Sequence, residues 1–183
     1  MRLPSALLLV ALLAQPALAQ TWRPPMVVWT TKPRQVGFYF GPYFFSAEMG
    51  LTQFLGRFGR DERTLTDSFG FKHLYFPTRG FELVATTANQ ILGLTFYTEE
   101  AAAPRGMHFQ VAEVVTDTGL GPGNTWNDVW TVQGKPHLQK VDETGDKLYI
   151  LEYHVSAKQD LDFFFRQKDS RAKIVKLGLY PRR

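Results

Sequence analysis

The sequence predicts an α+β fold in which two tandem helix–three-strand units form one antiparallel sheet with both helices on one face. Two segments, 49–58 and 126–133, carry apolar residues at helical spacing, and each is followed by segments with strand-like composition. Matching segments recur in the same order in both halves: the strands predicted at 91–97 and 174–180 both end on Leu-x-(Phe/Leu)-Tyr. One unit has too little helix to cover its sheet, so two units are expected to share a core.

The composition suits one packed domain. The chain has 183 residues, of which 44% are hydrophobic, and it has no cysteine. These values exclude a disordered chain, a disulfide framework, a thiolate zinc site and a cysteine nucleophile. The net charge is +4, but the basic residues are interspersed with acidic residues and form no basic stripe. We therefore expect no nucleic-acid partner.

The first 19 residues have the pattern of a secretory signal peptide. Arg2 is followed by an apolar stretch at 6–14 and by the cleavage pattern Ala17-Leu18-Ala19. The apolar stretch is shorter than the roughly 20 residues that a membrane-spanning helix needs. We therefore expect cleavage after Ala19 and a bacterial protein that is periplasmic or secreted and has no transmembrane segment.

The first predicted repeat spans 35–106 and follows an extended, proline-containing lead-in at 20–34. The short helix at 49–58 opens the repeat. Its three strands are predicted at 73–76, 80–85 and 91–97, with a turn at Asn89-Gln90 between the last two.

The second predicted repeat spans 107–183. Thr125 and Asp128 have the spacing of a capping box at the start of its helix. Gly134 and Pro136 end that helix, because glycine accepts a left-handed cap and proline cannot continue a helix. Strands are predicted at 107–116, 147–154, 161–166 and 174–180.

Segment 119–136 resembles a motif of small exported bacterial proteins, Gly-x-(Ser/Thr)-x-x-(Asp/Glu)-Val followed by Gly-x-Pro. The residues that carry it are Gly123, Thr125, Asp128, Val129, Gly134 and Pro136. The motif is similar to the repeat of the SmpA/OmlA (BamE-like) family and of the tandem fold of β-lactamase-inhibitory proteins. This resemblance implies an α+β architecture and a binding or envelope-assembly role rather than catalysis.

The motifs of catalytic and metal sites are incomplete. Ser170 and Lys173 match the pattern S-x-x-K, but its companion elements S-D-N and K-T-G are absent. Four histidines lack the spacing of metal ligands: His73, His108, His137 and His154. We therefore expect no catalytic residues, no metal and no cofactor, and we expect that the protein is not an enzyme.

These observations favour an exported, non-catalytic binding or envelope-associated module that contacts a protein partner in the cell envelope. The aromatic run at 37–45 cannot direct every ring into one core, because alternate strand residues face opposite ways. Tyrosine and tryptophan are frequent anchors of protein interfaces. The candidate contact residues are Tyr75, Tyr97, Tyr153, Tyr180, Trp29 and Tyr43.

Two other functions stay open at this point. A small-ligand carrier with a lipocalin-like barrel would need about eight strands around one cavity. A secreted hydrolase would use Asp160, Asp162 and His154, provided that a cleft brings such groups together. Whether the sheet is open, closed or cleft-bearing discriminates among the three functions.

Overall fold

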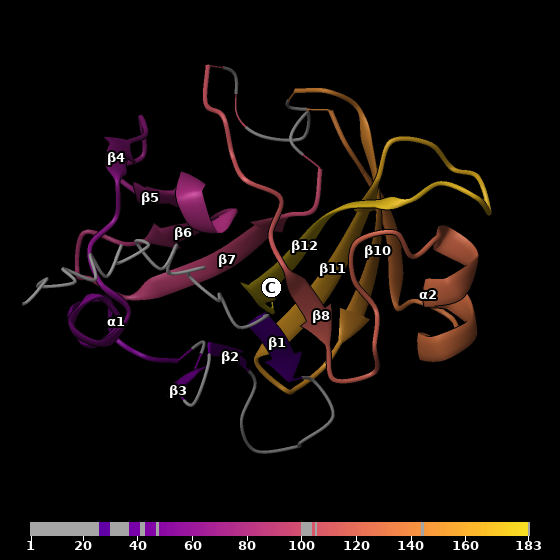
Figure 1. Cartoon of the computed structure of the whole chain (residues 1–183), viewed down its shortest axis with the longest axis horizontal. Coiled ribbons are helices and arrows are strands. Elements are labelled where there is room, and N and C mark those ends of the chain that lie inside the picture. Colours follow the sequence, from indigo (N-terminus) through magenta and orange to yellow (C-terminus); the bar gives the residue numbers. More distant parts are fainter. Residues whose placement is uncertain are drawn as a thin grey trace, which may run out of the picture.

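A computed structural model shows two β-sheets and two short α-helices in the described part of the chain (Figure 1). The residues that it describes are 26–29, 37–40, 43–46, 48–99, 104, 106–143 and 145–182. The predicted signal peptide at 1–19 and most of the lead-in at 20–34 lie outside this part.

The larger sheet has eight antiparallel strands in the order β4-β5-β6-β7-β12-β11-β10-β9. Its two halves meet where β7 pairs with β12. The strands are β4 (Arg63–Thr66), β5 (Lys72–Phe76), β6 (Phe81–Ala85), β7 (Ile91–Tyr97), β9 (Leu138–Asp142), β10 (Leu148–His154), β11 (Gln159–Phe165) and β12 (Ile174–Pro181). In the described residues β4 and β9 are the two ends of this order and do not pair with each other, so this sheet is open. The carrier hypothesis needs a closed sheet instead.

The smaller sheet has four strands in the order β3-β2-β1-β8. Its last pairing joins β1 to the edge strand β8 in parallel, so the start of the described chain lies beside its middle. Gly37 is required in this sheet, because a Cβ atom there would lie 2.2 Å from the carbonyl oxygen of Phe45. The strands are β1 (Met26–Trp29), β2 (Gly37–Phe40), β3 (Tyr43–Ser46) and β8 (Val114–Thr116).

Helix α1 (Leu51–Phe58) and helix α2 (Trp126–Gln133) confirm the two helices predicted from the sequence. The predicted capping box of α2 is also present: the backbone N–H of Asp128 donates to Thr125 Oγ1, and the Asp128 carboxylate accepts from the backbone N–H of Thr125. Gly134 ends the helix with a φ of 78°. These local signals are strong because they depend only on residues within one helical turn.

Phenylalanine side chains form the centre of the main core. One side of this core is a face of the larger sheet, and the other side is formed by α1 and the smaller sheet. The rings of Phe76 and Phe81 stack with centroids 4.4 Å apart, and those of Phe54 and Phe58 are 5.1 Å apart. The alternation of strand side chains supplies one set of apolar residues to this face from every inner strand. Both α1 and Val129 of α2 contribute to the same core.

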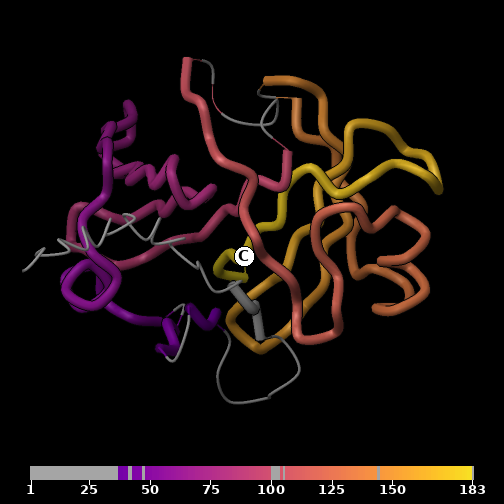
Figure 2. The backbone as a smooth tube through the Cα atoms, in the orientation of Figure 1, coloured from indigo at the N-terminus to yellow at the C-terminus, as the bar shows by residue number. Residues whose placement is uncertain are grey.

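The segment 106–113 crosses between the halves of the larger sheet (Figure 2). The backbone N–H of Gln110 donates to the carbonyl of Pro77, and that of Ala112 donates to the carbonyl of Tyr97. Gly80 permits this approach: its φ is 76°, and a Cβ atom there would lie 2.4 Å from the carbonyl oxygen of Gln110. The backbone after η1 (Pro77–Arg79) is therefore held against the crossing segment.

The predicted fold class is wrong. The described residues are mainly β, the helices have only eight residues each, and four strands rather than three follow each helix. The additional strands, β4 and β9, are short and mostly exposed, so their side chains do not show the apolar alternation that marks a strand. The strand predicted at 107–116 is reduced to β8 and joins the smaller sheet instead. The repeat boundary at 106/107 stays a prediction.

Replacement of Phe54 by alanine is expected to lower the free energy of unfolding by about 3–5 kcal/mol, because the side chain is fully buried among other rings and its removal leaves a cavity. Chemical denaturation measures this loss. The control, Gln53→Ala, changes an exposed residue of the same helix and should stay within about 0.5 kcal/mol of the unchanged protein. Equal losses for both variants would contradict the proposed core.

Candidate functional site

The second face of the larger sheet is unusual because its polar side chains are buried. Residues in register across antiparallel strands share a face, and this face pairs Glu82 with Thr95 and Glu152 with Asp162. These residues and Asp160 are between 4% and 8% exposed. Burial of a carboxylate is costly unless a partner compensates its charge. The partners of these groups therefore define the candidate site, which consists of two clusters that each contain a histidine.

The first cluster is a chain of hydrogen bonds that runs from a surface turn to a buried tyrosine. His73 Nε2 lies 3.3 Å from Asp67 Oδ2, and His73 Nδ1 lies 2.6 Å from Glu82 Oε1. The hydroxyl of Tyr97 donates to Glu82 Oε2 at 2.6 Å. Because both ring nitrogens of His73 face carboxylates, both are best satisfied when each carries a proton.

The charges in this chain shift its pKa values. Burial lowers the pKa of His73, but its hydrogen bonds to the carboxylates of Glu82 and Asp67 and their negative charges outweigh this effect, and the net shift is upward. Burial beside the negative charge of Glu82 raises the pKa of Tyr97. Burial likewise raises the pKa of Tyr75 to about 12, with a further contribution from Glu82. The tyrosines of this cluster therefore stay neutral at physiological pH.

The turn at the outer end of this chain holds Phe69 in the solvent. Oδ1 of Asp67 accepts hydrogen bonds from the backbone N–H groups of Phe69 and Phe71, both at 2.9 Å. Gly70 has a φ of 84°, which glycine adopts without strain. Phe69 is 83% exposed at the tip of this turn. The Asp67 carboxylate thus fixes a turn that presents a large apolar ring.

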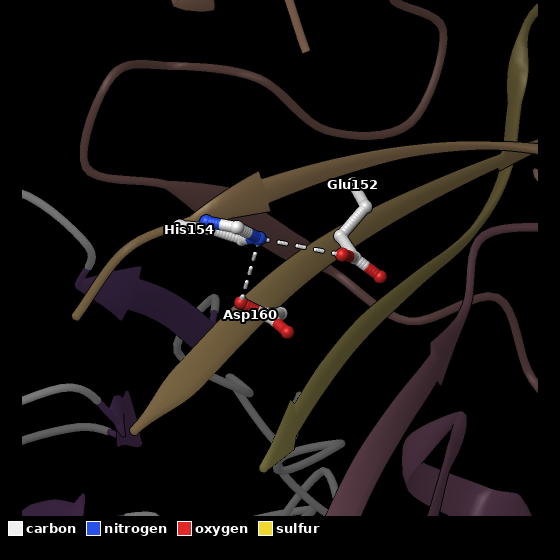
Figure 3. Close-up of side chains that lie close together, drawn as sticks. All are labelled: Glu152, His154 and Asp160. Atoms are coloured by element: carbon white, nitrogen blue, oxygen red, sulfur yellow. Dashed lines mark ion pairs between the residues drawn. The ribbon is translucent and has the colours of Figure 1, made fainter. Parts of the chain in front are cut away.

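The second cluster consists of Glu152, His154 and Asp160 on the adjoining strands β10 and β11 (Figure 3). His154 Nε2 lies 3.5 Å from Glu152 Oε1 and 3.8 Å from Asp160 Oδ1. Lys140 Nζ forms an ion pair with the other oxygen of Glu152, Oε2. The ring of His137 stacks on that of His154 with centroids 4.0 Å apart.

Asp160 is a buried carboxylate with one oxygen that lacks a hydrogen-bond donor. Among the described residues no group donates to its Oδ1 atom, and the same holds for Oδ1 of Asp162 on this face. Burial, together with the nearby negative charge of Glu152, raises the pKa of Asp160. The Asp160 carboxylate is thus the least well compensated member of the second cluster.

The tyrosines predicted to contact a partner are mostly buried. Tyr75 and Tyr97 lie on the polar face against Phe109, at 6% and 2% exposure. Tyr153 lies on the opposite face in the main core, and its hydroxyl donates to the carbonyl of Gly134. A contact role for these tyrosines stays a prediction, which this burial does not favour.

The remaining predicted contact residues are differently placed. The Tyr180 ring lies against Gly178 and Gly93, where a Cβ atom would approach it to 2.2 and 2.6 Å, and its hydroxyl is 2.7 Å from Thr95 Oγ1. Tyr43 is 59% exposed at the start of β3. Trp29 ends β1, and its side chain lies outside what the structure describes.

The structure brings together two of the three residues named for a hydrolase. His154 and Asp160 are direct partners across β10 and β11, and Asp162 lies two residues further along the same face. Glu152 was missed. The signal that could have found it is its spacing of two residues from His154, because such residues share one face of a strand.

The comparisons with known proteins identify no family. No protein-family profile and no curated protein matches the sequence. Two solved structures are similar in part. An extracellular protein containing an SCP domain from Bacillus anthracis has 10% identity and a TM-score of 0.39, and the match covers 72% of this chain and 42% of that one. A cysteine-rich secretory protein from Staphylococcus aureus has 11% identity and a TM-score of 0.46, and the match covers 86% of this chain and 51% of that one. The chain spans about half the length of these structures or less, and similarity at this level supports no argument about function.

The resemblance to the SmpA/OmlA family and to β-lactamase-inhibitory proteins is wrong. No family profile matches the sequence, and the described residues are mainly β rather than two helix–three-strand units. The motif residues start and end a helix, and such local signals occur in many folds. They lie in the first turns of α2 or directly beside its ends: Gly123, Thr125, Asp128, Val129, Gly134 and Pro136. In the part of the chain that the structure describes, no helix is long and apolar enough to cross a membrane.

The raised pKa of His73 predicts that its contribution to stability depends on pH. Protonated His73 stabilises the fold fully below the unfolded pKa of about 6.5, and this contribution is lost as the pH rises through the higher pKa of the folded state. His73→Gln should therefore destabilise the protein more at pH 5.5 than at pH 8.5. Urea denaturation of both proteins at the two pH values measures the difference. A loss of equal size at both would show that His73 is not charged in this network.

Proposed function

We propose that the chain is an exported, non-catalytic module that binds a protein partner through the β4–β5 hairpin, which comprises residues 63–76. The observation that carries this proposal is the 83% exposure of Phe69 on a turn that the Asp67 side chain holds in place. The signal-peptide pattern at 1–19 supports the export part of the proposal.

A fixed turn favours binding because little conformational freedom is lost when the partner arrives. Burial of an exposed phenylalanine side chain contributes about 1.5–3 kcal/mol. Leu65 on the neighbouring strand β4 is 41% exposed and extends the apolar surface of the hairpin. The hairpin thus combines an anchor residue with a rigid support.

The position of the hairpin adds a second way to contact a partner. β4 is the end of the larger sheet, and among the described residues the strand that it pairs with is β5. The backbone groups along its outer edge would accept an added strand, which is a common mode of peptide recognition. A partner strand along β4 would lie beside the turn that carries Phe69.

The histidine of the hairpin supports a binding role over a catalytic one. Both ring nitrogens of His73 are engaged by carboxylates, Asp67 on one side and Glu82 on the other. This arrangement holds the ring and stabilises its charged form, whereas a general base needs a free nitrogen near the reacting group. His73 therefore stabilises the hairpin in this proposal.

A photo-crosslinking amino acid placed at position 69 tests the proposed contact in the native host. We expect a covalent adduct of defined mass with one exported or envelope protein. The adduct should decrease when Asp67→Ala releases the turn, because the hydrogen bonds to Phe69 and Phe71 are then lost.

The matched control places the same crosslinker at Val141, which is 46% exposed on β9 at the opposite end of the sheet. Position 141 should give no adduct of that mass. Adducts of equal yield at both positions, or none at position 69, would contradict binding through the hairpin.

A further inference from the structure

We propose that Glu152, His154 and Asp160 form a binding site for one divalent first-row transition-metal ion, with Zn²⁺ as the representative ion. This site is separate from the β4–β5 hairpin and does not depend on the proposed protein contact. It uses one imidazole nitrogen and two carboxylate oxygens, the donor types that such ions take in proteins.

The geometry converges on a single point. One atom, His154 Nε2, faces both Glu152 Oε1 at 3.5 Å and Asp160 Oδ1 at 3.8 Å, and the ligand atoms all lie within 4.8 Å of one another (Figure 3). Ligand atoms around a tetrahedral Zn²⁺ ion, bound at about 2.0–2.1 Å, are about 3.3 Å apart. Small side-chain rotations therefore suffice to bring all three atoms to bonding distance.

Asp160 supplies an independent indication that this cluster suits a cation. The residue is 5% exposed, and its Oδ1 atom accepts no hydrogen bond although it faces His154. A buried carboxylate oxygen without a donor carries an uncompensated cost of desolvation. A metal ion bound by the three residues would compensate the charge on this oxygen.

The groups around the cluster orient its ligands. Lys140 occupies Oε2 of Glu152 and leaves Oε1 to face the histidine. His137 Nδ1 accepts a hydrogen bond from the backbone N–H of His154, while its ring stacks on the ligand ring. Such outer partners fix the direction of metal ligands in known sites.

The first cluster shows why a histidine with two carboxylates is not sufficient. Asp67 and Glu82 bind different ring nitrogens of His73, so they lie on opposite sides of the ring. One ion cannot contact both carboxylates and the ring there. His73 is therefore a matched control: its cluster has the same residue types without the convergence.

Isothermal titration of the purified exported protein with Zn²⁺ tests the site. We expect one ion per chain and a higher melting temperature in its presence. Asp160→Asn and His154→Gln should each weaken Zn²⁺ binding by about 100-fold or more, because the first replaces a charged carboxylate ligand by a neutral amide and the second removes the imidazole nitrogen. His73→Gln should leave the affinity unchanged.

Folding of the variants is checked by near-ultraviolet circular dichroism without metal. Asp160→Asn removes a buried charge and should fold at least as well as the unchanged protein. His154→Gln alters a half-buried side chain and provides the second measurement if Asp160→Asn does not fold.

Three results would overturn the proposal. The first is no Zn²⁺ binding by the unchanged protein at millimolar concentration. The second is Zn²⁺ binding that persists at full affinity in a folded Asp160→Asn or His154→Gln variant, which would place the ion elsewhere. The third is tighter binding of Ca²⁺ or Mg²⁺ than of Zn²⁺, which would show that the imidazole is not a ligand.

Discussion

The burial of carboxylates on one face of the larger sheet is the constraint on which the rest of the structure depends. Desolvation of a charged side chain costs several kcal/mol unless an opposite charge or a hydrogen-bond donor replaces water. Glu82 obtains these partners from His73 and Tyr97, and Glu152 obtains one from Lys140. Asp160 obtains less from the described residues, since its Oδ1 atom accepts no hydrogen bond there, and Oδ1 of Asp162 likewise accepts none. The two histidine clusters are therefore the parts of this face whose side chains can bind a ligand or change their protonation state.

The polar face exists because the opposite face is a phenylalanine core. Side chains alternate along a strand, so the strands that direct Phe81, Phe96 and Phe163 into the core also direct Glu82, Thr95 and Asp162 to the other side. A shift of register by one residue would exchange the two sets and bury charges among aromatic rings. The rigidity of the core thus sets the positions of the polar groups, and through them the geometry proposed for the metal ligands.

The helices were predictable in detail, whereas the sheets were predictable only in part. Helix α2 is defined by Thr125, Asp128 and Gly134, which act within a few residues of one another. The inner strands follow from their apolar alternation, but β4 and β9 are short and exposed at the two ends of the sheet. Of the second cluster, His154 and Asp160 were named from the sequence, but that they are neighbours required the pairing of β10 with β11. Glu152 was missed although it lies two residues from His154 on the same strand. Six tyrosine and tryptophan positions were named for partner contact, yet burial of a ring depends on which face of the sheet it occupies.

The sequence by itself determined the helix boundaries, the strand character of the inner segments, the pattern of an export signal and the absence of cysteine chemistry. Each of these depends on neighbouring residues or on composition. Only the tertiary structure decided the strand order, the parallel pairing of β1 with β8, and the convergence of groups on His154. Those features join residues that are far apart in the chain, and their pairing is selected by the packing of whole sheets. Local patterns carry no information about which distant strand becomes the neighbour, so the site appears only when the strands are assembled.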